Sequence, residues 1–572
     1  MTTPFSRRVA LQGLAAASLA SMSGAATAQP YRPTQRGGGG TLKLLFWQGP
    51  TLLNPHFATG QKDMEGCRLF YEPLIAWDQN GEMLPVLAAE IPSRANGGVA
   101  ADGRSVTWKL KKGVLWHDGK PFTADDVIFN HRYAMDPKTA ATTSGSYGGV
   151  KTVEKVDTHT VRVVFEKPTP FWAGTYASDQ FIPKHVFEPF IGANSREAPA
   201  NLRPVGTGPY TFVDFKPGDM VRGKLNPNYH LPHRPHFDTV ELKGGGDAVS
   251  AARAVLQTGE YDFAWNLQVE DELLKRLEAA GKGVVTLQQG GVVEFIQLNF
   301  TDPNREVDGE RSHRDTRHPI FSDPAVRQAI GLLIDRQNIQ AFIYGRTGRV
   351  TANIVNDLPR FNSTALKTEF NPEKAAALLE AAGWKRGARG IREKDGRPLR
   401  LLFQTSINST RQKTQAIIKQ AAAKAGIDIE IKAVQGAVFF STDVANTDTY
   451  GKFYADMQMY TNSLGRPDPQ GFLRQFISEE ISSKSNKWQG DNLSRWRNAE
   501  FDSLYKQAET ELDPAKRAEQ VKRMNDLVIR DGYVIPVVAR TEVTARARTL
   551  VGPISAWRLS LDQIHDWYRQ PA

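Results

Sequence analysis

Short apolar stretches typical of β-strands recur along the whole chain, and helices with recognisable caps lie between them. The strand candidates are "TLKLLFW", "SVTWKL", "THTVRVVF", "YTFVDF", "FDTVELK", "VEFIQLNF", "LRLLFQT" and "IDIEIKAV". Thr123 followed by Asp126 has the spacing of a capping box and predicts a helix over residues 124–134. Further helices are expected to begin at Asp323-Pro324, Asn371-Pro372 and Asp513-Pro514, the last two ending at Gly383 and Gly532. This mixed order predicts α/β lobes rather than a β-sandwich or a helical bundle.

The length and charge of the chain limit its class. A chain of 572 residues exceeds what one hydrophobic core normally organises, so we expect two or more domains. The net charge of +10 is spread along the sequence, without a block of Lys and Arg and without a recognised nucleic-acid-binding motif. We therefore expect no nucleic-acid partner.

The N-terminus has the features of an export signal. Arg7 and Arg8 precede a mildly apolar stretch that ends in the small residues Ala26-Thr27-Ala28. This pattern predicts a twin-arginine type signal peptide over residues 1–28 and a periplasmic location. Beyond it, no stretch reaches the ~18 apolar residues of a membrane helix. Cys67 is the only cysteine, so no internal disulfide can form even in an oxidising compartment.

The stretch "LWHDGKPFTADDVIFN" places a histidine beside carboxylates and permits two interpretations. In the first, His117-Asp118 belongs to a secreted hydrolase. In the second, these residues form a turn in which Gly119 adopts positive φ. The acidic residues that follow then stabilise the first turn of the next helix through its dipole. Since no nucleophile accompanies the pair, the sequence favours the turn.

Several segments, in order, resemble a known family. They are "FYEPLIAWDQNGEMLPVLAAE", "VTWKLKKGVLWHDGKPFTADDVIF", "VGTGPYTF", "FSDPAVRQAIGLLIDRQNI", "NPEKAAALLEAAGW" and "NAEFDSLYKQAETELDPAKRAEQVKRMNDLVIRDGYVIPV". Together they resemble the extracellular solute-binding proteins of the dipeptide/oligopeptide-binding family (family 5). The resemblance extends over nearly all of residues 41–570.

This resemblance implies a two-lobed periplasmic binding protein fold of α/β class, the large type with an extra small subdomain in the first lobe. Paired crossing segments near "VVEFIQLNF" and "GYVIPVVAR" would join the lobes. The division implied is a signal peptide over 1–28, a flexible linker over 29–40, a first lobe with the inserted subdomain over 41–285, a second lobe over 300–530, and a return to the first lobe over 531–572.

The resemblance also implies a function without catalysis. Such a protein would capture a peptide-like or other small solute by lobe closure and deliver it to an inner-membrane ABC permease complex, as a monomer and without a cofactor. No P-loop is present, so energy would come from the partner. A binding protein that serves a sensor rather than an importer remains an alternative, because both use lobe closure as the signal.

The ligand-binding loop of peptide-binding relatives departs from the pattern here. In such relatives an aspartate shortly before an Asp-Pro segment pairs with the α-amine of the peptide. Here "MQMYTNSLGRPDPQGFL" retains Asp468 but places Gly465, with Ser463 and Arg466 nearby, at the corresponding position. An ordinary peptide amine would lack its carboxylate there. Arg466 would either bind a carboxylate or phosphate of the ligand or remain a solvated loop residue.

Aromatic and amide residues near strand ends are further candidates for the ligand site, with burial in the core as the alternative for each aromatic. In addition to Arg466 and Asp468, the candidates are Trp47, Asn54, Trp265, Asn266, Tyr460 and Asn462. Phe46 lies in the same stretch, "FWQGPTLLN", as Trp47 and Asn54.

Three histidines lie close together in "NYHLPHRPHFD". His230, His233 and His236 could hold Zn²⁺ or Ni²⁺. Pro232 and Pro235 exclude a regular helix, so nothing in the sequence fixes the rings on one face. We expect a surface loop without a metal.

Overall fold

The structure is a computed structural model, and it describes residues 32–571 apart from residues 59, 442–444, 487 and 489. The expected signal peptide, residues 1–28, lies outside the described residues. The largest sheet within them has 11 strands in the order β17-β16-β18-β11-β19-β10-β1-β9-β8-β7, with β12 also paired to β19. In that order the strands are Asp428–Val434, Arg400–Ser406, Met457–Ser463, Gly283–Leu298, Val534–Ala547, Phe263–Ala264, Thr41–Phe46, Thr239–Gly244, Met220–Leu225 and Tyr210–Lys216, and β12 is Gly348–Val350.

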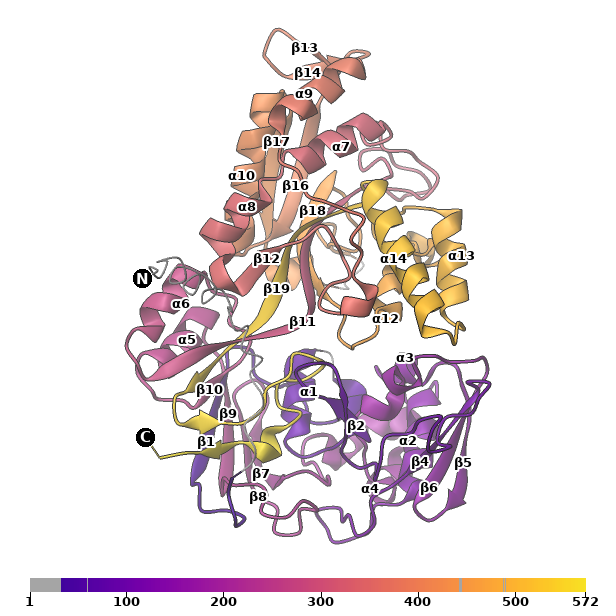
Figure 1. Cartoon of the computed structure of the whole chain (residues 1–572), viewed down its shortest axis with the longest axis vertical. Coiled ribbons are helices and arrows are strands. Elements are labelled where there is room, and N and C mark those ends of the chain that lie inside the picture. The colour runs from indigo at the N-terminus through magenta and orange to yellow at the C-terminus, as the bar shows by residue number, and fades with distance from the viewer. Residues whose placement is uncertain (1–31, 59, 442–444, 487, 489, 572) are drawn as a thin grey trace, which may run out of the picture.

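The elements divide into two lobes (Figure 1). The first lobe contains β1 and β7 to β10, and we define it as residues 41–278 together with the tail after β19. The second lobe contains β16 to β18, flanked by α7 (Pro324–Leu332), α9 (Pro372–Ala381), α10 (Ser409–Ala425), α13 (Ala499–Ala508) and α14 (Pro514–Arg530), and we define it as residues 324–530. The exact limits predicted from the sequence stay a prediction.

A small subdomain lies within the first lobe. Its sheet has the order β4-β6-β5 (Ser105–Lys109, Thr160–Phe165 and Val150–Asp157), and α2 (Ala124–Met135) packs on β5 and β6. Thr123 caps α2, and Asp126 accepts a hydrogen bond from the Thr123 backbone, which confirms the predicted capping box.

The other predicted helix starts are also confirmed. Each cap side chain accepts hydrogen bonds from the first backbone N–H groups of its helix, and proline follows the cap at the first position. These caps are Asp323 for α7, Asn371 for α9 and Asp513 for α14. Gly383 and Gly532 follow α9 and α14 with φ of +88° and +69°, the conformation that ends many helices.

The long strands β11 and β19 run from one lobe to the other (Figure 1). They pair antiparallel in two stretches, from Gly283–Ala547 to Gln288–Glu542 and from Val292–Arg540 onward, with a bulge between the stretches. Gly291 lies in this bulge with φ of +68°. Because a bulge interrupts the ladder and bends the strand, this point is the natural hinge between the lobes.

The lobes are in contact with each other. One buried apolar cluster contains Trp77 and Trp557 of the first lobe as well as Leu464 and Phe472 of the second. The two lobes therefore share one buried apolar cluster in this structure.

The start of the described chain packs on the first lobe. Arg36 donates to the backbone carbonyls of Pro227, Tyr229 and Leu231, and the N–H groups of Gly38 and Gly40 donate to the Asp238 carboxylate. Residues 36–40 of the expected linker are thus held by the loop that precedes β9.

Two further features concern helix length and the single cysteine. Over residues 32–571, with the gaps given above, no helix is both long and apolar enough to cross a membrane. Cys67 is fully buried in α1 (Gln61–Arg68) and carries a free thiol.

Candidate functional site

The His117 turn has a structural role. The N–H of Gly206 donates to His117 Nδ1 at 3.0 Å, and Nε2 lies 3.1 Å from the Gly208 carbonyl, to which it donates. Burial lowers the pKa of His117 to about 4, so the ring stays neutral. Asp118 pairs with His185 rather than with His117, and its Oδ2 lies 2.6 Å from His185 Nε2. Both ring nitrogens serve the backbone, and the hydrolase hypothesis has no support.

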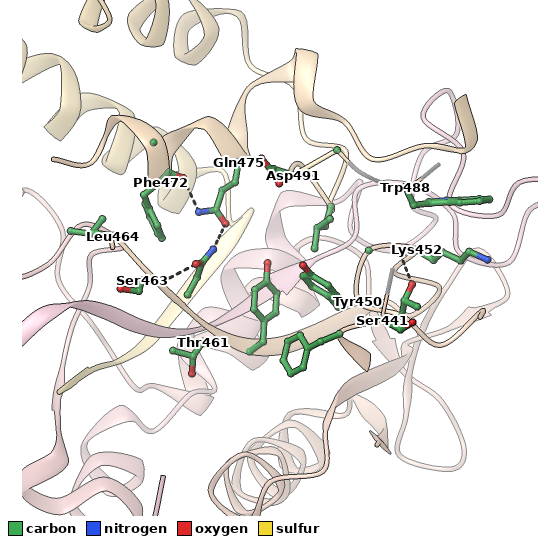
Figure 2. A pocket seen from close by; sticks show the side chains of 18 residues that line it. Ser441, Tyr450, Lys452, Thr461, Ser463, Leu464, Phe472, Gln475, Trp488 and Asp491 are labelled. Atoms are coloured by element: carbon green, nitrogen blue, oxygen red, sulfur yellow. Dashed lines mark hydrogen bonds between the residues drawn. The ribbon is translucent and has the colours of Figure 1, made fainter. Parts of the chain in front are cut away.

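A pocket of about 540 Å³ lies in the second lobe beside the end of β18. Figure 2 shows its aromatic, amide and hydroxyl side chains around a common space. It is lined by Phe440, Ser441, Thr449, Tyr450, Gly451, Lys452, Tyr460, Thr461, Asn462, Ser463, Leu464, Gly471, Phe472, Gln475, Trp488, Gly490, Asp491 and Leu493.

The wall formed by β18 leaves backbone groups without a strand partner on one side. β18 pairs with β11 along its length, but with β16 only from Met457 to Met459. Within the described residues, the edge from Tyr460 to Ser463 is not covered by another strand. The sequence predicted a loop over this stretch, and the strand corrects that prediction. Its alternating apolar side chains are those of a strand buried between β11 and β16.

Two of the candidate residues lie in this pocket. Tyr460 packs against Phe295 and Tyr450, with ring centroids 4.9 and 5.4 Å apart, and burial raises its pKa well above the usual value. Asn462 donates from Nδ2 to Gln475 Oε1 at 3.1 Å, and its Oδ1 accepts from the Ser463 N–H at 2.8 Å. The pocket is therefore preorganised by contacts within its own wall.

A buried ion pair supports this wall from behind. Glu294 of β11 pairs with Arg411 at 2.6 Å and with Arg540 of β19 at 3.5 Å. Both arginines also donate to the hydroxyl of Thr461, at 2.7 and 2.9 Å. Burial raises the pKa of Glu294, but the two guanidinium groups outweigh it and hold the pKa below the usual value. The network fixes β18 to the two crossing strands.

Arg466 contacts groups across the lobe boundary, which neither interpretation of the sequence included. Its guanidinium donates to the Gly174 carbonyl, and Nη2 lies 3.4 Å from the Ser146 hydroxyl and 3.3 Å from Asp179 Oδ1. These three partners belong to the first lobe. Arg558, also in the first lobe, pairs with the same Asp179 oxygen at 3.0 Å. Arg466 therefore joins the two lobes.

Asp468 is committed to the scaffold of the second lobe. Its oxygens accept from Arg517 at 2.6 and 2.8 Å, and Oδ1 accepts from the Gln470 N–H at 3.0 Å. Such a bidentate pair leaves little capacity for a ligand.

The first-lobe candidates lie in two other places. Trp47 donates from its indole to the Asn266 carbonyl at 2.9 Å. Phe46 stacks on Trp265 with centroids 4.9 Å apart, and both rings are buried in the core. Asn54 is fully buried, where it caps a short 3₁₀ turn and donates to Asn201 at 2.7 Å. None of these residues lines the second-lobe pocket.

The three histidines do not form a metal site in the part of the chain that is described, where no group of three or more His, Cys, Asp or Glu side chains could hold a metal ion. His230 Nε2 lies 2.9 Å from Glu72 Oε2 in the first lobe. His236 lies over Gly39 and edge-on to Tyr568.

Gln475, Trp488 and Asp491, like most of the residues that line the pocket, were missed by the sequence analysis. They come from short turns and 3₁₀ segments after β18, where no periodic pattern marks a buried face. The one available signal was an aromatic residue inside the polar run "SSKSNKWQGDN".

Comparisons with known proteins agree with this architecture. The profile of Bacterial extracellular solute-binding proteins, family 5 Middle, matches residues 82–484. The chain is 26% identical over 502 residues to the oligopeptide-binding protein AppA of Bacillus subtilis, covering 86% of this chain and 85% of the relative. It is 24% identical over 506 residues to the glutathione-binding protein GsiB of Escherichia coli K12, covering 88% and 89%.

Solved structures show the same two-lobed fold. NikZ from Campylobacter jejuni in complex with Ni(L-His) superposes with a TM-score of 0.75 at 22% identity, covering 92% of this chain and 99% of that one. AppA from Bacillus subtilis in complex with a nonapeptide gives 0.73 at 24% identity, covering 94% and 100%. The family profile matches well over half of the chain, and the predicted resemblance is confirmed: the chain belongs to the bacterial extracellular solute-binding proteins of family 5.

Proposed function

We propose that this chain is the substrate-binding component of an ABC importer and that it captures a peptide-like or other small solute by closure of its lobes. The observation that carries the proposal is the pocket beside the uncovered end of β18, in a molecule whose lobes are in contact. A pocket of about 540 Å³ has the size of typical small-ligand sites.

The uncovered edge of β18 favours an extended ligand. Backbone N–H and C=O groups at a sheet edge can pair with a peptide as an added strand. The relatives AppA and GsiB are named for oligopeptide and glutathione binding, which agrees with a ligand that has amide groups. Tyr460 and Asn462 lie on this edge of β18, and we propose that they contact the ligand.

The remaining candidate residues differ in whether we propose that they contact the ligand. Trp47 and Asn266 lie in the first lobe, and we propose that they contact the ligand from that side. Asp468 and Asn54 are bound to other residues, so the proposed site does not include them. Arg466 contributes through the lobe contact rather than through the ligand.

We also propose that residues 1–28 are a twin-arginine signal peptide and that the mature protein acts as a monomer in the periplasm. The paired arginines and the small residues before Gln29 support this. The proposed partner is an inner-membrane permease complex, which would recognise the closed lobes.

The experiment is isolation of the protein from its native host without denaturation, followed by mass spectrometry of the released small molecules. We expect a retained solute that raises the melting temperature of the emptied protein, and we expect Asn462→Ala to weaken that effect. A protein that retains nothing and gains no stability from the host's small-molecule extract would contradict the proposal.

A further inference from the structure

The charged groups of the pocket are unevenly distributed. Among its described lining residues, Asp491 is the one carboxylate and Lys452 the one ammonium. Figure 2 shows Asp491 beside Gln475 and Lys452 beside Trp488, on different walls. The Lys452 ammonium lies 4.5 Å from the centroid of the Trp488 ring, so it forms a cation–π interaction with that ring.

Asp491 has no charged or hydrogen-bonding partner for its carboxylate among the described residues. Among the described residues, the cation that acts on Asp491 electrostatically is the guanidinium of Arg474, and this group is already paired with Glu480 at 2.8 and 2.6 Å. That pair is neutral as a unit, so among the described residues of this wall Asp491 adds one negative charge that has no ion-pair partner. Burial raises the pKa of Asp491, Arg474 opposes the shift, and Glu480 adds to it. A carboxylate that has no ion pair is stabilised when a cation binds beside it.

The walls next to Asp491 suit the apolar part of such a ligand. Tyr450 and Tyr460 pack edge to face at 5.4 Å, and Phe472 lies on the same side as Gln475 (Figure 2). Aromatic faces also attract a cation directly when it is desolvated. Among the described lining residues, the side of the pocket opposite Lys452 thus combines one carboxylate that forms no ion pair with aromatic surface.

We propose that Asp491 binds a cationic group of the solute, an ammonium or a guanidinium, while the neighbouring aromatic rings hold an apolar part of the same molecule. The proposal rests on the proposed function and names the ligand class of that site. It also accounts for Gly465: the carboxylate that this loop lacks is supplied by a different segment of the same wall. The loop does contain two charged residues, but Arg466 is paired with Asp179 and Asp468 is paired with Arg517.

The test compares three probes of similar size that differ in charge: 2-phenylethylammonium, 2-phenylethanol and 3-phenylpropionate. Calorimetry on the wild-type protein should give the ammonium a dissociation constant at least roughly tenfold below that of the alcohol. Asp491→Asn should bring the two constants together. Asp395→Asn, which removes one negative charge from an exposed turn of the same lobe, should leave the preference intact.

Each other outcome overturns the inference. Equal or tighter binding of the alcohol or the carboxylate, a preference that survives in Asp491→Asn, or no binding by any probe would each contradict it. Because Asp491 forms no ion pair, Asp491→Asn should melt with the wild type, which excludes unfolding as the cause of lost binding. A protein that is stabilised by its native solute but does not discriminate between the probes retains the proposed function and loses only this inference.

Discussion

Replacing Arg466 with alanine should shift the molecule toward an open arrangement of its lobes. The guanidinium reaches from the second lobe to the Gly174 carbonyl, the Ser146 hydroxyl and the Asp179 carboxylate of the first. The substitution removes all three contacts and adds none. Asp179 retains Arg558 at 3.0 Å, so its charge does not become unpaired.

The size of the effect follows from these contacts. A hydrogen bond to a charged group contributes about 1.5–3 kcal/mol to stability. The Arg466 side chain is 28% exposed and Asp179 is 4% exposed, so solvent screens part of the pair and the lower end applies. We expect a loss of about 1–2 kcal/mol, which changes the ratio of closed to open molecules by roughly 5–30-fold. Arg466→Lys should recover part of it, because the ammonium keeps the charge but not the planar fork.

Double electron–electron resonance between two spin labels measures the distance between the lobes, and the distance distribution gives this ratio. Labels at Val156→Cys and Glu373→Cys lie on exposed positions of the two lobes, and the buried Cys67 stays unlabelled. Arg466→Ala should reduce the short-distance population, whereas the control Arg389→Ala, an exposed turn residue of the second lobe, should not. An unchanged distance distribution in Arg466→Ala would refute the assignment of Arg466 as a lobe contact.

Three further outcomes follow from the same structure. Gly291→Ala should lower the free energy of unfolding by about 1–2 kcal/mol because its φ of +68° disfavours a side chain; a melting temperature equal to wild type would show that the hinge bulge relaxes freely. Glu294→Gln should cost about 3–5 kcal/mol in urea unfolding, since it leaves Arg411 without its buried carboxylate; a loss below about 1 kcal/mol would contradict the role of this pair. The folded pKa of His117, about 4, lies below the ordinary 6.5. Between these pH values the unfolded chain binds a proton that the folded protein does not bind. The free energy of unfolding therefore falls as the pH drops through this window, by up to about 3 kcal/mol. His117→Gln should flatten this part of the stability profile, and an identical profile would exclude His117 as the cause.

The parts of the fold that were predictable are those set by short-range chemistry. The Thr123 cap of α2 and the Asp513 cap of α14 were evident because the side chain bonds to backbone groups two or three residues away. The turn after His117 was assigned correctly for the same reason, since Gly119 adopts positive φ and the Lys120 N–H donates to Asp118. The bonds of the His117 ring to Gly206 and Gly208 are long-range and were not predictable.

The parts that were not predictable depend on partners far along the chain. Arg466 meets Asp179, 287 residues earlier, and no local pattern marks that pairing. Asp491 and Gln475 join Tyr460 in one pocket only because the segments after β18 return to its end. Their individual residue types are ordinary for exposed turns, so the sequence predicted the class of protein and one wall of the site but not the whole pocket.

The most direct test of solute capture by lobe closure is the distance between the Val156→Cys and Glu373→Cys labels in emptied protein, before and after addition of the solute released from natively isolated protein. We expect the solute to shorten and narrow the distance distribution, with a smaller effect in Asn462→Ala. A distribution that stays the same while calorimetry shows the solute bound would contradict the claim that binding closes the lobes.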